Sequence, residues 1–105
     1  MTILTNEKKK FRAYFVEVSE ESLSVDLEDG RSITVPLAWF PRLLNGTPEE
    51  RSNWKLIGKG EGIHWPELDE DISVENLLKG LPSKESQSSF KKWLSSRSSK
   101  KTSRR

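Results

Sequence analysis

Alternating apolar residues on either side of Gly30 constrain the fold of this chain more than any other feature. The apolar members of this pattern are Leu23, Val25, Leu27, Ile33 and Val35. A period of two predicts two β-strands, and both apolar sets can face one core only if odd residues pair with odd residues. A two-residue loop would pair Leu27 with Ser32 and set the apolar faces against each other. A three-residue loop over residues 28–30, with Gly30 left-handed, pairs Val25 with Ile33 and is therefore predicted.

Short strands and helices account for the rest of the body. Strands are expected at residues 14–18, 23–27, 31–35, 54–57 and 63–65, the last two forming a hairpin, and a buried turn of helix at residues 36–44. Thr47 and Glu50 form a capping box for a helix that ends near Asn53. Ser73 caps a final helix that Gly80 and Pro82 end, with Ile72 and Leu77 as a hydrophobic staple. We expect an α+β fold, with a small antiparallel sheet of about five short strands and two or three short helices.

Composition limits the chemistry that is available. The chain has 105 residues, of which 32% are hydrophobic, enough for one small domain. It has no cysteine and one histidine, so thiol catalysis, a disulfide framework and a structural zinc site are not expected, and no cofactor is predicted. The N-terminus lacks the apolar stretch of a signal peptide, and no run approaches a membrane span. We expect a cytoplasmic protein.

The C-terminal part differs from the body in charge and composition. Residues 91–105 carry seven basic residues and no acid, whereas residues 1–90 hold the other 11 basic residues and all 16 acidic ones. Nine serines follow Pro82, a composition that rarely buries enough surface to offset the entropy of ordering. We therefore expect a flexible N-terminus at residues 1–12, a compact domain at residues 13–81 and a disordered basic tail at residues 82–105.

One stretch of the tail departs from this pattern. Phe90, Trp93 and Leu94 are spaced at i, i+3 and i+4, so they would form an apolar stripe if the stretch became helical. This spacing predicts a segment that folds when it meets a partner.

Six blocks of sequence resemble a known bacterial family. They are DGR at 29–31, VPL at 35–37, WFPRL at 39–43, TPEER at 47–51, GIHWP at 62–66 and LDEDISV at 68–74. In this order, across residues 14–80, they resemble the domain-of-unknown-function family numbered 2442. The resemblance implies the fold but no catalytic residues. Some members of that family are regarded as antitoxin-like partners of small toxins encoded beside them, and the tail from Pro82 lies outside the resemblance.

Three features invite a chemical interpretation and have a structural alternative. His64 followed by Asp69 and Asp71 could form a general base, but an outward-facing strand residue is favoured because no nucleophile is evident. Glycines at 58, 60 and 62 could cradle a phosphate, but no helix follows them, which favours a hairpin loop. The acidic run over residues 67–71 could bind a toxin surface or a cation, but a solvated entry to the last helix is favoured.

Two basic features are candidate binding elements. Arg42 and Arg51 accompany Trp39, Phe40 and Trp65, and arginine with aromatic residues is typical both of binding hot spots and of ordinary surfaces. The tail bases Lys100, Lys101, Arg104 and Arg105 could contact phosphates weakly and with strong salt dependence.

The leading hypothesis is a non-enzymatic protein interaction module with a protein partner, antitoxin-like in function. The candidate partner-binding residues are Arg42, Arg51, His64, Asp69, Asp71, Phe90, Trp93 and Leu94. The alternatives are a DNA-associated regulator that uses the basic tail, and a small-molecule or hydrolytic site around His64.

Overall fold

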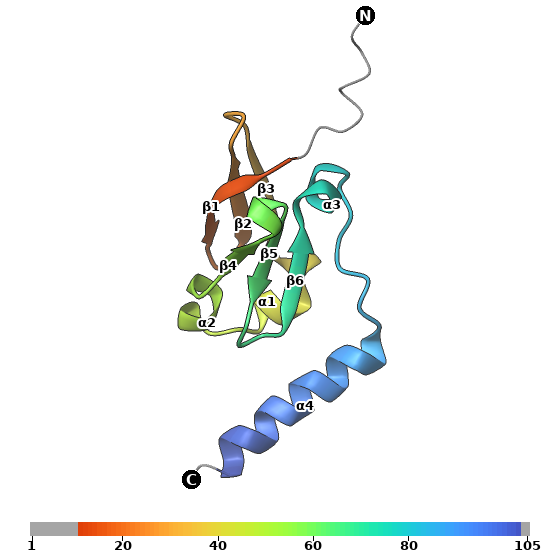
Figure 1. Cartoon of the computed structure of the whole chain (residues 1–105). Helices are drawn as coiled ribbons and strands as arrows, with labels where there is room; N and C mark the ends of the chain where they lie inside the picture. The colour runs from red at the N-terminus through yellow and green to blue at the C-terminus, as the bar shows by residue number, and fades with distance from the viewer. Residues whose placement is uncertain (1–10, 104–105) are drawn as a thin grey trace, which may run out of the picture.

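The computed structural model describes residues 11–103, with side chains described for residues 11–97. Within this range the chain forms two three-stranded antiparallel sheets, three short helices and one long C-terminal helix (Figure 1). The elements in order are β1 (Ala13–Val18), β2 (Ser22–Leu27), β3 (Ser32–Pro36), a 3-10 turn (Leu37–Trp39), α1 (Pro41–Leu44), α2 (Pro48–Ser52), β4 (Lys55–Ile57), a second 3-10 turn (Gly58–Gly60), β5 (Gly62–Trp65), β6 (Glu70–Ser73), α3 (Val74–Leu78) and α4 (Gln87–Ser103). The α+β class expected from the sequence is confirmed.

The first sheet has the order β1-β2-β3 and the predicted register. Val25 pairs with Ile33, and the Leu27 N–H donates to the Arg31 carbonyl at 2.8 Å. Gly30 adopts φ +97°, which an L side chain rarely tolerates. The three-residue loop is thereby confirmed.

The second sheet has the order β4-β5-β6 and includes a strand that the sequence did not predict. β4 and β5 form the expected hairpin, and β6 pairs antiparallel with the other side of β5, placing Asp71 opposite His64. The expected single sheet of about five strands is therefore two sheets of three.

Both predicted helix caps are present. The Thr47 hydroxyl accepts from the Glu50 N–H at 3.1 Å, and the Glu50 carboxylate accepts from the Thr47 N–H at 2.9 Å, which completes the capping box of α2. The Ser73 hydroxyl accepts from the Asn76 N–H at the start of α3. Pro48 stands at the first helical position of α2, where its missing N–H costs nothing.

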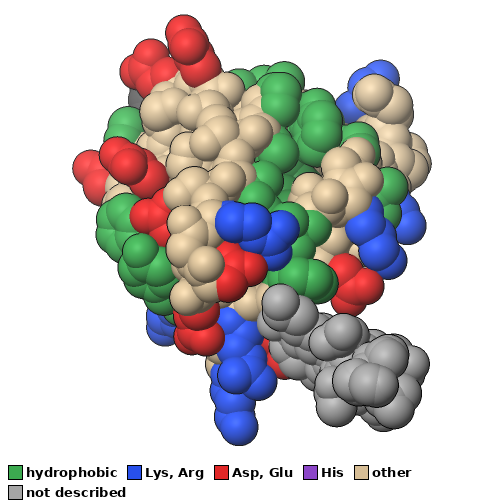
Figure 2. Space-filling model, turned by 90° about the horizontal axis from the view of Figure 1, so that it is seen from above, with side chains coloured by type: hydrophobic (Ala, Val, Ile, Leu, Met, Phe, Trp, Pro, Cys, Tyr) green, Lys and Arg blue, Asp and Glu red, His purple; other side chains and the backbone are tan. Residues whose placement is uncertain are grey.

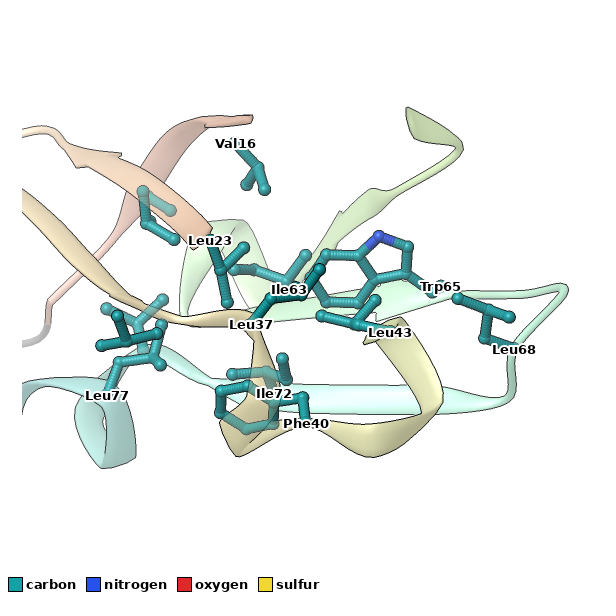
Figure 3. Packing of buried hydrophobic residues seen from close by; sticks show 14 of the residues in the cluster. Val16, Leu23, Leu37, Phe40, Leu43, Ile63, Trp65, Leu68, Ile72 and Leu77 are labelled. Carbon is teal, nitrogen blue, oxygen red and sulfur yellow. The ribbon is translucent and has the colours of Figure 1, made fainter. Parts of the chain in front are cut away.

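The core lies between the two sheets and α1 (Figure 3). Trp65 is its largest fully buried side chain, and its indole Nε1–H donates to the Arg51 carbonyl at 2.9 Å. The other side chains in the most buried group are Leu23, Leu27, Leu37, Leu43, Ile63, Leu68, Val16, Val25 and Val74. The alternating residues of the first hairpin thus supply one wall of the core, as their period indicates.

Helix α4 occupies much of the segment for which disorder was expected. A linker over residues 79–86 leads from α3 down beside β6, and α4 follows it below the sheets (Figure 1). The Ser86 hydroxyl accepts from the Ser89 N–H at 3.1 Å and caps the helix. Contacts between its first half and the body stabilise a helix that the serine-rich composition disfavours. Residue 11 also differs from the expected flexible N-terminus, because Phe11 packs against the core; residues 1–10 lie outside the described part.

Candidate interaction site

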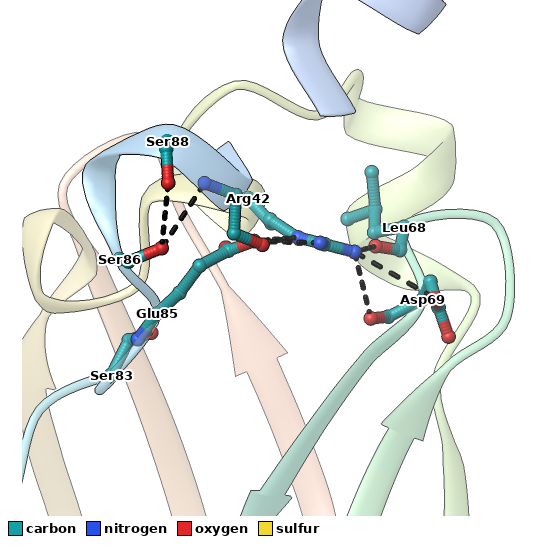
Figure 4. Close-up of polar contacts among 8 residues, drawn as sticks. Arg42, Leu68, Asp69, Ser83, Glu85, Ser86 and Ser88 are labelled. Atoms are coloured by element: carbon teal, nitrogen blue, oxygen red, sulfur yellow. Dashed lines mark hydrogen bonds and ion pairs between the residues drawn. The ribbon is translucent and has the colours of Figure 1, made fainter. Parts of the chain in front are cut away.

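Arg42 is the centre of the contacts between the body and the linker. It is the second residue of α1, and its side chain is 15% exposed. Its Nη1 donates to the carbonyls of Leu68 and Asp69 at 3.2 and 3.1 Å, while its Nε and Nη2 donate to the Glu85 carboxylate, the shortest bond being 2.6 Å (Figure 4). This two-pronged contact fixes the linker before α4 begins.

The Trp93 ring contacts two arginines. The guanidinium carbon of Arg42 is 5.1 Å from the centroid of the Trp93 ring, and that of Arg97 is 4.8 Å from it. Arg97 in turn donates to both carboxylate oxygens of Glu50 at 2.9 and 3.1 Å. We call Arg42, Glu85, Trp93, Arg97 and Glu50 the docking cluster, because it attaches α4 to α1 and α2.

The ionisation of the docking cluster reflects these pairs. Hydrogen bonding to Arg97 lowers the pKa of Glu50, and hydrogen bonding to Arg42 lowers the pKa of Glu85. The same bond to Glu85 raises the pKa of Arg42. Glu50, Glu85 and Arg42 are therefore charged at neutral pH.

Of the predicted stripe, Trp93 makes the principal contacts with the body. Phe90 stacks on the Trp93 ring with centroids 5.8 Å apart, and Leu94 is half-buried. Sequence reasoning missed Glu50, Glu85 and Arg97. A sequence signal existed for Glu85 alone, because it is the only acidic residue after Pro82.

Arg51 has a structural role instead of joining this cluster. Its Nε and Nη2 donate to the Leu43 and Leu44 carbonyls at 2.9 and 2.8 Å. These carbonyls lie in the last turn of α1, where the regular i+4 helical donors are lacking, and the Leu43 carbonyl also accepts from the Gly46 N–H at 3.1 Å. Arg51 thus joins α2 to α1, and its predicted part in partner binding stays a prediction.

His64 and the two aspartates named with it are divided by the fold. His64 Nδ1 contacts the Asp71 carboxylate across β5 and β6, where the two residues face each other. Asp69 lies in the turn before β6, with its carboxylate 3.8 Å from Arg42 Nη1. The Asp71 side chain is 68% exposed, so the pair lies on an open sheet face.

The glycine-rich loop connects β4 to β5 and packs on the start of β1. Gly60 is buried with φ +98°, and a Cβ there would lie 2.5 Å from the Ala13 carbonyl oxygen. Close backbone approach explains this glycine, as a hairpin-loop interpretation allows.

A narrow slot separates β6 from the linker. It has a volume of about 220 Å³ and is lined by Glu70, Asp71 and Ser73 on one side and by residues 81–84 on the other. Phe40 and Ile72 contribute apolar surface to it. Sequence reasoning missed this slot because β6 itself was not predicted.

Three further kinds of binding were considered from the sequence: to nucleic acid, to a metal ion and to a membrane. On the face seen in Figure 2, basic side chains are scattered among acidic and apolar ones. The side chains of Lys100, Lys101, Arg104 and Arg105 lie outside the described part. Among the described residues, no three His, Asp or Glu side chains gather as metal ligands, and none of the helices has the length and apolarity needed to cross a membrane.

Comparison with known proteins agrees with the resemblance seen in the sequence. Residues 15–83 match the family described as "Protein of unknown function (DUF2442)", and the chain belongs to this family. It is similar to the crystal structure of a protein of unknown function from Rhodospirillum rubrum, with 26% identity and a TM-score of 0.63 over 73% of this chain and 95% of that chain. An uncharacterized protein from Chromobacterium violaceum, solved by NMR in solution, shares the fold at 22% identity, with a TM-score of 0.61 over 77% of this chain and 74% of that chain. No curated protein matches the chain.

Proposed function

We propose that this protein is a protein–protein interaction module in which α4 is the recognition element. The observation that carries the proposal is the contact of the Trp93 ring with both Arg42 and Arg97. Aromatic and arginine side chains dominate binding hot spots, and here they hold a helix that lies beyond the family match, which ends at residue 83. The antitoxin-like function implied by the family resemblance is one form of this proposal, with a small toxin as the partner.

The chemistry of the docking cluster suits reversible attachment. No described side chain of α4 is among the buried residues of the core, and Trp93 is only partly buried against it. The contact consists of one indole ring and ion pairs that remain in reach of water; the Arg97 and Glu50 side chains are each 19% exposed. A cation–π contact at such a site contributes roughly 0.5–1 kcal/mol. The helix can therefore leave the body at modest cost.

Release of α4 exposes the predicted stripe. Phe90, Trp93 and Leu94 then become available together to a groove on a partner, which is a common way for an amphipathic helix to be recognised. If docking contributes about 1–2 kcal/mol, it lowers the apparent partner affinity by roughly 5–30-fold. Weakening the docking should then strengthen binding.

Affinity capture from the native host tests the proposal. Four baits are compared: the full chain, a chain that ends at Leu81, Trp93→Ala, and Lys91→Ala as the matched control, since Lys91 is an exposed residue of the same helix. We expect one stoichiometric small protein on the full chain and on Lys91→Ala, and its loss from the other two baits. Capture of that protein by the chain ending at Leu81, or of no protein by any bait, would contradict the proposal.

A body-side variant separates release of α4 from recognition by α4. Glu50→Gln keeps a capping-box side chain at the third position of α2 but removes the charge that holds Arg97. With the captured partner, calorimetry should show about 2–5-fold tighter binding for Glu50→Gln and at least tenfold weaker binding for Trp93→Ala. Equal affinity of Glu50→Gln and the wild type would show that docking and recognition do not compete.

A further inference from the structure

Strand β6 presents free backbone groups at the edge of the second sheet. The Val74 N–H donates to the Glu61 carbonyl at 3.0 Å, which makes positions 74, 72 and 70 the ones whose peptide groups point toward β5. Asp71 and Ser73 alternate with them and direct their N–H groups away from β5. In the described part of the chain these two N–H groups and the Asp71 carbonyl have no hydrogen-bond partner.

The linker stands opposite this edge without pairing to it. The Leu81 N–H donates to the Asn76 carbonyl and the Ser83 N–H to the Trp39 carbonyl, both at 3.0 Å. The linker is thus tied to α3 and to the turn before α1, and Figure 1 shows it running beside β6. The slot of about 220 Å³ lies between the two. An unpaired strand edge beside an open slot is the geometry that accepts an added strand.

The side chains that line the slot define the charge of its occupant. Glu70 is half-buried, and its side chain makes no hydrogen bond or ion pair with the described residues. The pKa of Glu70 is raised to about 7, chiefly by burial; the charge of Arg42 lowers it, and the charges of Glu85, Asp71 and Asp69 raise it. Lys84 is the one basic residue among the lining residues. A cationic side chain in the slot would supply the partner that Glu70 lacks.

We propose that the slot between β6 and the linker binds an extended basic peptide segment of a partner protein. The segment adds as a short strand to β6, exchanging backbone hydrogen bonds with Asp71 and Ser73, and places a Lys or Arg side chain beside Glu70. Apolar contact with Phe40 and Ile72 favours β-branched neighbours of that cation. This surface is separate from the docking cluster, and binding there does not require release of α4.

Selection from a displayed library of random linear heptapeptides on the full chain tests this inference. We expect enriched peptides to carry a Lys or Arg flanked by β-branched residues and to shift the Asp71 and Ser73 amide resonances of the isotope-labelled full chain. Affinity should fall about tenfold in Glu70→Gln. Glu67→Gln is the matched control, because it removes the same charge from an exposed residue just before β6.

The peptide backbone provides the second arm of the test. N-methylation at a residue whose N–H faces β6 should abolish binding, whereas N-methylation at the next residue should leave it within twofold, because neighbouring residues of a strand point their N–H groups to opposite sides. No enrichment, equal affinity for Glu70→Gln, or equal effects of the two methylations would overturn the proposal. Concentration-dependent shifts of the Asp71 and Ser73 amides without peptide would assign the slot to a second copy of the chain and overturn it as well.

Discussion

The guanidinium carbon of Arg42 lies 5.1 Å from the centroid of the Trp93 ring, which joins two parts of the chain of different character. Arg42 belongs to the segment that matches the family, and Trp93 lies beyond the end of that match. The body therefore provides a receptor site for the extension that follows it. Glu85 pairs with the same arginine, so the linker and the helix both contact Arg42.

Trp93→Ala should release α4 while leaving the body folded. A serine-rich helix of 17 residues is marginal in water without tertiary contacts. We expect the α4 amides to lose protection from hydrogen exchange and the far-ultraviolet circular dichroism to lose helical signal. The body should melt close to the wild-type temperature, because no described side chain of α4 is among the buried residues of the core. Lys91→Ala should retain both signals; unchanged α4 protection in Trp93→Ala would show that other contacts hold the helix.

Acid should also release α4. The pKa values of Glu50 and Glu85 are lowered in the folded state, so their contribution to docking is present above the usual glutamate pKa of 4.5 and is lost as the pH falls through the lowered values. The Trp93 indole N–H resonance should move toward its position in the undocked helix below pH 4.5. In Glu50→Gln the part of this change that comes from Glu50 should disappear. A Trp93 resonance that stays constant down to pH 2.5 would show that ionised Glu50 and Glu85 do not hold α4 on the body.

The opposite pH dependence is expected from Glu70. Its pKa is raised to about 7, chiefly by burial, so folding favours the protonated form and stability falls as the pH rises from 4.5 through 7. Glu70→Gln should remove this loss and be more stable than wild type at pH 8, by on the order of 1–3 kcal/mol, with little difference at pH 5. Urea denaturation at the two pH values measures the effect. Glu67→Gln should not show this gain in stability over wild type at pH 8. If Glu67→Gln and Glu70→Gln gained equally, the role of Glu70 in the pH dependence of stability would be refuted.

The sequence predicts local structure well because the deciding forces are local. The odd-with-odd register around Gly30 follows from side-chain alternation, and the capping box of Thr47 and Glu50 uses residues three apart. Strand β6 was missed because three of its four residues are polar and only Ile72 is apolar. Its extended form comes from pairing with β5, which no local pattern encodes.

In the candidate site too, the local feature was predicted from the sequence and the long-range contacts were not. The spacing of Phe90, Trp93 and Leu94 predicts a helical stripe, and Trp93 does make the main contact. Its partners could not be predicted, because Arg42 and Glu85 are 43 residues apart and Glu50 and Arg97 are 47 apart. Disorder was expected from composition, yet these long-range pairs hold α4 in place.

A pair of glycine variants separates steric contact from backbone strain. Gly30 and Gly60 have nearly the same φ, +97° and +98°, but a Cβ at Gly30 would meet no atom within 4 Å, whereas one at Gly60 would lie 2.5 Å from the Ala13 carbonyl oxygen. Gly30→Ala should therefore cost about 1–2 kcal/mol from the left-handed conformation alone. Gly60→Ala carries the same strain and must also push β1 away from the β4–β5 loop, so we expect a loss larger by at least about 2 kcal/mol. Urea denaturation of both variants gives the difference directly. Equal losses would mean that the loop and the start of β1 can separate freely, and the close packing of Gly60 on Ala13 would then not contribute to stability.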